Sequence, residues 1–133
     1  MENILATKGL SLFLKNDTDS IGNRIGEVEL VRQQMNHLTL DNFEPNDSNK
    51  YFLFQCSQKV EKIKSFDFAR PAPGIIINFV EFIQSLPLDA LLFFKDGYIH
   101  SLELYSCDGQ QFDDLDLERV DVKSIEVHRI GQN

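Results

Sequence analysis

The sequence predicts a single α+β domain over residues 1–133, with an antiparallel sheet of about five to six strands packed against one or two helices. Three observations lead to this prediction. Short apolar runs are separated by turn-forming residues, an Asp96-Gly97 pair lies between two such runs, and apolar residues recur at helical spacing in two other segments. A chain of 133 residues with 42% hydrophobic residues and eleven Phe can build one sizeable core.

The N-terminal third contains a helical stripe. Ile21, Ile25, Val28 and Met35 fall at i, i+4, i+7 and i+14, which favours a helix. Two glycines within the stripe oppose it, because each costs about 1 kcal/mol relative to alanine in a helix interior. Residues 27–31 are also compatible with a strand, and the helix is the favoured interpretation.

Three candidate strands follow this stripe. Residues 37–43 place two leucines on one face, and residues 51–57 form a short aromatic-rich run that suits a strand buried on both faces. Between them, Pro45 and a cluster of Asn, Asp and Ser predict a turn. The third candidate is the segment 62–69, in which two Lys and two Phe alternate onto one face.

A second helix is predicted after Pro71-Ala-Pro-Gly74. Apolar residues from Ile76 to Leu86 form a broad helical face, with polar residues opposite. Pro87 cannot donate a backbone hydrogen bond, so the helix should end near Leu86. Such a wide apolar face requires cover, and the hairpin that follows is the natural cover.

Residues 91–107 predict a β-hairpin. A two-residue type I′ turn at Asp96-Gly97 needs positive φ at both positions, which Gly adopts without strain. The register that follows sets Phe94 opposite Ile99, Phe93 opposite His100 and Leu91 opposite Leu102. The favoured core face of the second strand carries Tyr98, His100, Leu102 and Leu104.

A last strand is predicted over residues 120–130. Its apolar phase shifts between Val122 and Ile125. Because a shift of one residue turns a strand's side chains to the other face, the shift predicts a β-bulge near Lys123-Ser124.

The net charge, the N-terminus and the cysteine spacing each argue against one class of site or location. A net charge of −8 argues against binding nucleic acid, which needs a basic surface. The N-terminus has neither the basic start of a signal peptide nor an apolar run of membrane-spanning length, so we expect a cytoplasmic protein without membrane contact. Cys56 and Cys107 lie far apart without Cys-x-x-Cys spacing, which predicts reduced thiols rather than a disulfide or zinc site.

Acids and bases are distributed unevenly along the chain. Seven acids and only one base, Arg119, lie between Glu103 and Asp121, whereas five bases and two acids lie between Lys50 and Arg70. Such polarity steers a basic partner toward the acidic segment. The alternative is that the acid-rich turns only keep the protein soluble.

Sequence motifs for catalysis are weak. The glycines form no phosphate-binding loop, and no cofactor is predicted. His37, His100 and His128 lie on three separate predicted strands, so a metal site would require the fold to bring them together. Neither cysteine lies where its pKa would be lowered for nucleophilic attack. These motifs therefore predict no particular reaction.

The segment Leu91-Leu-Phe-Phe-Lys-Asp-Gly-Tyr-Ile-His-Ser-Leu-Glu-Leu-Tyr105, followed by the Asp108-Gly109 turn, resembles the C-terminal half of small bacterial immunity proteins. These belong to contact-dependent growth inhibition and other polymorphic toxin systems. The resemblance covers about residues 75–110. It implies a protein that is not an enzyme but a tight stoichiometric inhibitor of a cognate toxin domain, commonly a nuclease with a basic cleft.

An acidic surface would occupy such a cleft in place of phosphates. Aromatic side chains would anchor the centre of the contact. The predicted partner-binding residues are Tyr105, Asp108, Phe112, Asp113, Asp114, Asp116, Glu118 and Asp121. Two alternatives stay open: an adaptor domain without a toxin partner, and a small metal-dependent enzyme. Strand addition at a sheet edge and the oligomeric state are also open.

Overall fold

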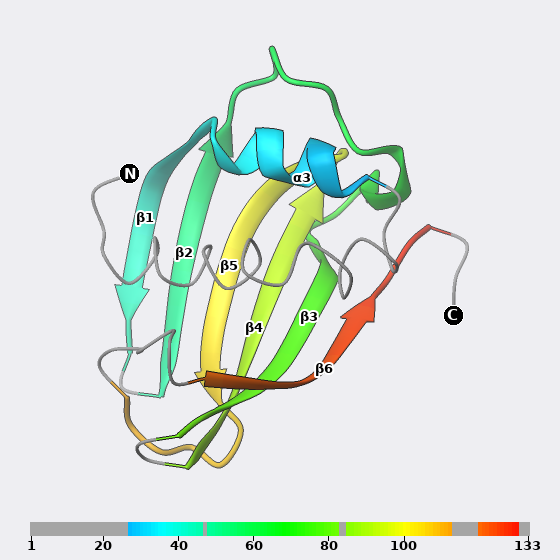
Figure 1. Cartoon of the computed structure of the whole chain (residues 1–133). Coiled ribbons are helices and arrows are strands. Elements are labelled where there is room, and N and C mark those ends of the chain that lie inside the picture. Colours follow the sequence, from blue (N-terminus) through cyan, green and yellow to red (C-terminus); the bar gives the residue numbers. More distant parts are fainter. Residues whose placement is uncertain (1–26, 47, 83–84, 113–119, 131–133) are drawn as a thin grey trace.

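The computed structural model describes residues 27–46, 48–82, 85–112 and 120–130. In these ranges the chain forms one antiparallel sheet of six strands, helix α3 and a short 3-10 helix η1, which confirms the predicted antiparallel sheet (Figure 1). The helices are α3 (Val28–Met35) and η1 (Lys64–Phe66), and the strands are β1 (Leu38–Pro45), β2 (Asn49–Cys56), β3 (Ala72–Glu81), β4 (Leu86–Lys95), β5 (Tyr98–Ser106) and β6 (Val120–Val127). Their order across the sheet is β1-β2-β5-β4-β3-β6, so β1 and β6 are the edges.

The predicted helix after residue 74 is wrong, because residues 72–81 form β3. Ile75, Ile77 and Phe79 are buried, whereas Ile76 and Val80 are only partly buried on the opposite face. Ile is β-branched, so it loses side-chain freedom in a helix and packs well on a pleated sheet. The run of three Ile therefore favours the strand.

The β4–β5 hairpin is confirmed, with a correction to its register. Asp96 and Gly97 have φ values of 55° and 82°, as the type I′ turn requires, and Phe94 pairs with Ile99. A bulge then leaves His100 as an extra residue. The predicted pairs Phe93–His100 and Leu91–Leu102 are therefore wrong: Phe93 pairs with Ser101, Leu91 with Glu103 and Leu92 with Leu102.

The bulge also changes which residues of β5 enter the core. Leu102 and Leu104 are buried as predicted, but Tyr98 and His100 are only partly buried. Ile99 is buried in their place, because it precedes the bulge and faces the same side as Phe94.

Both edge strands carry a β-bulge with a charged residue at the extra position. In β6 the register shifts between the Asn78–Ser124 and Phe79–Val122 pairs, so Lys123 is the extra residue and the predicted bulge is confirmed. In β1 the shift leaves Asp41 unpaired with β2. Bulges and charges at an edge disfavour the addition of another strand.

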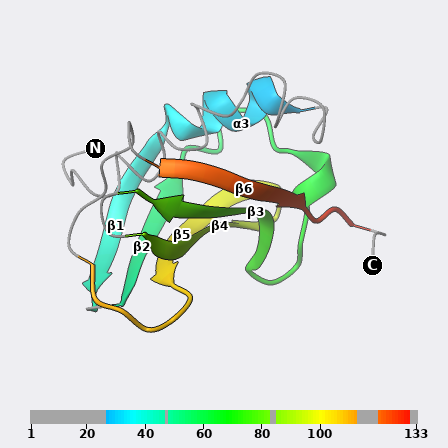
Figure 2. The same cartoon turned by 60° about the horizontal axis from the view of Figure 1, so that its bottom comes forward.

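Helix α3 packs against one face of the sheet, which we call the inner face. Its Val31 and Met35 belong to one buried cluster with Phe52, Leu92 and Leu102. Figure 2 shows α3 on this side of the sheet, and no described helix lies on the other side, which we call the outer face. The predicted N-terminal helix is thus confirmed for Val28–Met35, whereas Ile21 and Ile25 lie outside the described residues. In the described part of the chain, no helix is long and apolar enough to cross a membrane.

The segment predicted as a strand at residues 62–69 is a connection that folds onto the hairpin turn. The Ile63 amide donates to the Gly97 carbonyl at 2.8 Å, and the Asp96 amide donates to the Phe68 carbonyl at 2.8 Å. The Gly97 amide donates to the Phe66 carbonyl at 3.2 Å. Ile63 and Phe66 are fully buried, so this connection is part of the core.

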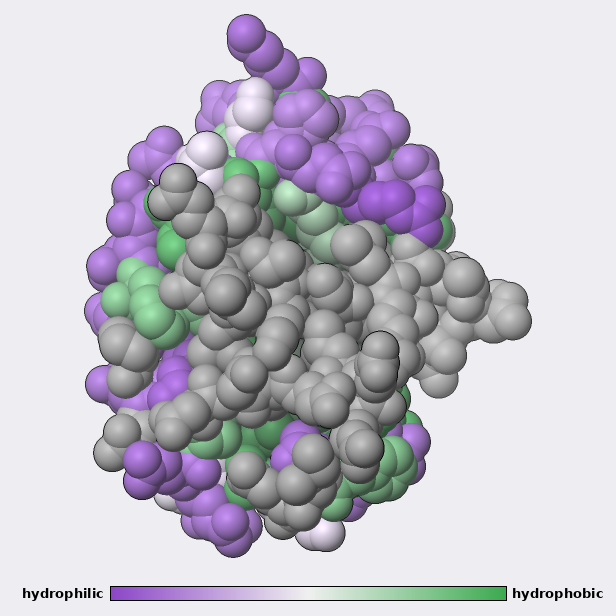
Figure 3. Space-filling view, turned by 60° about the vertical axis from the view of Figure 1, so that its left-hand side comes forward, coloured by the Kyte–Doolittle hydropathy of each residue, from purple (hydrophilic) through white to green (hydrophobic). Residues whose placement is uncertain are grey.

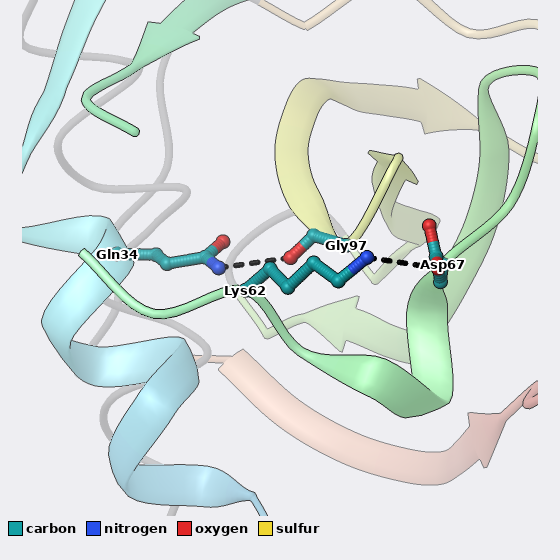
Figure 4. A network of polar contacts seen from close by, with 4 residues as sticks. All are labelled: Gln34, Lys62, Asp67 and Gly97. Carbon is teal, nitrogen blue, oxygen red and sulfur yellow. Dashed lines mark hydrogen bonds and ion pairs between the residues drawn. The ribbon is translucent and has the colours of Figure 1, made fainter. Parts of the chain in front are cut away.

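Gln34 of α3 joins the helix to the hairpin turn (Figure 4). Its Nε2 donates to the carbonyls of Gly97 at 2.9 Å and Glu61 at 3.0 Å, and its Oε1 accepts from the Ile99 amide at 2.9 Å. The side chain is 0% exposed. A buried amide in contact with three backbone groups fixes the helix, the turn and the connection relative to one another.

Candidate functional site

Four of the five bases between Lys50 and Arg70 lie at one end of the sheet, and the described acids of the segment 103–121 lie toward the other. The connection 57–71 and the β4–β5 turn lie at one end, where the exposed bases are Lys59, Lys62, Lys64, Arg70 and Lys95. Figure 3 shows hydrophilic residues covering this end. At the other end, the amides of Ser106 and Cys107 donate to the carbonyls of Ser48 and Pro87, which brings three connections together.

We call this second end the acidic end. The acids there that are exposed or partly buried are Glu44, Asp89, Glu103, Asp108 and Asp121. The described bases in the same half are Lys50, which is buried, and Lys123 at the β6 bulge. The described residues of this end therefore present mainly negative charge to solvent.

Carboxylates and apolar side chains alternate on the outer face near this end. One row of paired positions crosses all six strands: Glu44, Tyr51, Glu103, Leu91, Ile76 and Glu126. The next row contains Tyr105, Asp89 and Asn78. The central side chains of both rows are partly buried, so they are accessible at the surface.

Hydrogen bonds hold two of these carboxylates in place. The Tyr105 hydroxyl donates to Asp89 Oδ2 at 2.7 Å, and this bond, more than burial, raises the pKa of Tyr105 to about 12. Asn49 Nδ2 donates to Glu103 Oε2 at 2.6 Å. Each of these two bonds uses one acceptor oxygen and fixes the orientation of its carboxylate.

The structure describes four of the eight predicted partner-binding residues. Tyr105, Asp108 and Asp121 all lie at the acidic end, Tyr105 on the outer face and Asp121 at the start of β6. Asp108 Oδ1 accepts from the Ser106 hydroxyl at 2.7 Å and the Gln110 amide at 3.1 Å, and these bonds lower the pKa of Asp108. The other four residues, Asp113, Asp114, Asp116 and Glu118, lie outside the described residues.

Phe112 is placed differently from the other three. It is 3% exposed, and the Lys50 ammonium lies 5.1 Å from the centre of its ring. Lys50 Nζ also donates to the Asn46 carbonyl. The ring therefore anchors its own connection in the core, and in this conformation it is not available as an aromatic contact for a partner.

Sequence reasoning missed Asp89, Glu103 and Phe82 as site residues. Phe82 is 59% exposed and follows β3 at the acidic end. Asp89 lies within a run that alternates Leu86, Leu88, Ala90 and Leu92 on the inner face. This alternation predicts that Asp89 lies on the outer face, provided that residues 86–95 are assigned to a strand.

A pocket of about 300 Å³ opens where β2 and β5 separate. Their pairing ends at Leu53–Ser101, although β2 continues to Cys56 and β5 begins at Tyr98. Residues lining the pocket include Cys56, Lys95, Tyr98 and His100. Burial raises the pKa of the Cys56 thiol to about 11, so the thiol stays protonated and is a poor nucleophile near neutral pH.

The pocket should keep His100 neutral. Desolvation by burial, followed by the nearby positive charge of Lys95, lowers the pKa of His100 from 6.5. An NMR titration should find the value below 6.5, and Lys95→Gln should raise it without restoring 6.5, because the larger cause remains. The unfolded chain binds the His100 proton more tightly than the folded protein does. The contribution of neutral, buried His100 to the free energy of unfolding is therefore fully present above about pH 6.5, and it is lost as the pH falls through the folded-state pKa. Lys59→Gln is the control, and an equal shift in that variant would contradict the assignment to Lys95.

The described residues contain no group of three or more His, Cys, Asp or Glu arranged to hold a metal ion. His37 precedes β1 and His128 follows β6, so these two lie at opposite edges of the sheet. The fold thus does not bring the three histidines together. No protein-family model, curated protein or solved structure matches the chain.

Proposed function

We propose that the protein is a stoichiometric inhibitor that binds and neutralises a protein toxin, as immunity proteins do, and that it is not an enzyme. The observation that carries the proposal is the concentration of accessible carboxylates at the acidic end, where the described bases are a buried Lys50 and Lys123. The toxin would present a complementary basic surface.

The physical reason for this choice is charge complementarity. A nuclease keeps a basic cleft for phosphates, and carboxylates fixed on a rigid sheet can occupy the same positions. Asp89 and Glu103 are held by neighbouring side chains, which reduces the entropy that must be lost on binding. A net charge of −8 adds long-range steering toward a basic partner.

Charge reversal at the acidic end should abolish protection against the toxin encoded by a neighbouring gene. We expect Glu44→Lys, Glu103→Lys and Asp121→Lys together to slow association by about tenfold or more at low salt. The same variant should lose most of the salt dependence of association. The measurements are growth protection on co-expression and association rates of purified proteins at low and high salt.

The matched control reverses three exposed acids elsewhere. Glu29→Lys, Asp41→Lys and Glu61→Lys change the net charge by the same amount but leave the acidic end intact. If both variants lose protection and association rate equally, the effect arises from net charge alone and not from the acidic end. If no protein encoded nearby is toxic or binds this chain, the inhibitor proposal fails and an adaptor role takes its place.

A further inference from the structure

We propose that the docking surface is the outer face of the sheet, and that its partner is a protein surface with apolar side chains at its centre and Lys and Arg around them. This inference rests on the proposed function, since it names the surface that is used and the chemistry of the partner. It moves the centre of the contact from the acidic connection after Asp108 to β3, β4 and β5.

The first argument is the composition of two neighbouring strands inside the sheet, β3 and β4. β3 and β4 carry apolar side chains on both faces: Ile76, Val80, Leu91 and Phe93 point outward, opposite to the buried inner row. Antiparallel strands with one solvated face normally alternate apolar and polar residues. Strands that are apolar on both faces are typical of sheets covered on both sides. Among the described residues, α3 lies only on the inner side.

The second argument is the charge around this apolar centre. Glu44 and Glu126 lie at the two edges of the row that contains Leu91, and Glu103 lies next to Leu91 on β5. A second copy of the chain packed on the same face would bring carboxylates against carboxylates, which is unfavourable. A partner with Lys and Arg around an apolar centre satisfies both features at once.

The third argument concerns the sheet edges and an exposed aromatic ring. Asp41 and Lys123 occupy the bulges of the two edge strands, so strand addition is disfavoured on both sides.

Phe82 projects at the acidic end with 59% of its surface exposed. Phe is one of the residue types enriched in protein interfaces relative to the rest of the surface.

The first test replaces apolar residues that we place in the contact. Phe82→Ala and Leu91→Gln should each weaken toxin binding by about tenfold or more, with little change in thermal stability. Ile130→Ala is the control, because Ile130 is 56% exposed but follows β6 at the other end. If Leu91→Gln destabilises the free protein as strongly as a core substitution, another part of this chain covers the face, and the inference is overturned.

The second test needs no toxin. A synthetic amphipathic helix of Lys and Leu is titrated into the ¹⁵N-labelled full chain, and a Lys/Ser peptide of equal length serves as control. With the Lys/Leu peptide, we expect the largest amide shifts on β3, β4 and β5 and smaller ones near Glu44 and Glu126, and we expect weaker binding of the Lys/Ser peptide. Shifts on β1 or β6 without shifts on β3, β4 and β5, equal binding of both peptides, or no binding would each overturn the inference.

The two tests separate failure of the surface from failure of the function. If the toxin is bound but Phe82→Ala and Leu91→Gln bind it as well as the unmodified protein does, the docking surface is wrong and the inhibitor role stands. If no toxin is found but the Lys/Leu peptide maps to the outer face, the inhibitor role fails and the surface stands.

Discussion

Replacing Gln34 with alanine is expected to lower the free energy of unfolding by about 3 to 5 kcal/mol. The substitution removes three hydrogen bonds to backbone groups from a side chain that is 0% exposed, and each such bond contributes about 1 kcal/mol. It also leaves the Ile99 amide without this partner and creates a cavity between α3 and the hairpin. Urea denaturation followed by circular dichroism measures the change.

Two variants of the same helix sharpen this test. Gln33→Ala removes an exposed side chain from the neighbouring position, so it should change the free energy of unfolding by less than about 0.5 kcal/mol. Gln34→Glu keeps the shape of the side chain but places a carboxylate oxygen, which can only accept when ionised, against two carbonyl oxygens. The loss in free energy of unfolding should therefore grow as the pH rises above about 4.3, where the unfolded chain ionises this group. If Gln34→Ala proves no more destabilising than Gln33→Ala, the network does not hold the helix on the hairpin.

The strands that end in clear turns could be predicted from the sequence, and β3 could not. Asp96-Gly97 identifies its hairpin because the turn's positive φ values restrict the residue types. Residues 75–81 instead satisfy both helical and strand periodicity, because they are apolar on two sides and end in the buried Glu81. The three Ile favour the strand, and β4 and β6, which pair with the segment on both sides, supply the backbone partners that stabilise it.

The connection 57–71 shows a second limit. Alternating Lys and Phe at residues 62–68 resemble a strand, yet the backbone amides and carbonyls of this segment bond to the hairpin turn. Nothing in the local pattern indicates a partner that is about thirty residues away in the chain. In contrast, the β-bulge at Lys123 could be predicted, because the shift in the apolar pattern occurs within one strand.

The negative charge of the acidic end could be predicted from the sequence, whereas the positions of several of its residues could not. Charge clustering identified the acidic end, and Tyr105, Asp108 and Asp121 all lie there. The burial of Phe112 could not be predicted, because the ring joins a core built from residues far away in the chain, and its cation contact, Lys50, is more than sixty residues earlier. The sequence does not indicate Asp89 as a surface residue of a strand, because the predicted hairpin begins at Leu91, whereas β4 begins at Leu86.

Replacing Gly97 with alanine is expected to destabilise the protein by about 2 to 4 kcal/mol, of which only part arises from the turn itself. Alanine at a φ of +82° costs about 1 to 2 kcal/mol. The new Cβ would also lie 2.9 Å from Lys62 Cβ and 3.1 Å from the Ile63 carbonyl oxygen, so the packed connection would have to move.

Gly109→Ala separates these two causes. Gly109 has nearly the same φ, +78°, but no described atom lies within 4 Å of an added Cβ, so this variant carries the backbone cost alone. The difference between the two losses of unfolding free energy should be about 1 to 2 kcal/mol, and it measures the packing of residues 62–63 on the turn. The Lys62–Asp67 ion pair is largely exposed and contributes little to that difference. Faster hydrogen exchange at the Ile63 and Asp96 amides in Gly97→Ala, and not in Gly109→Ala, would locate the damage at this contact. Equal losses in the two variants would mean that the connection yields freely and does not fix the hairpin.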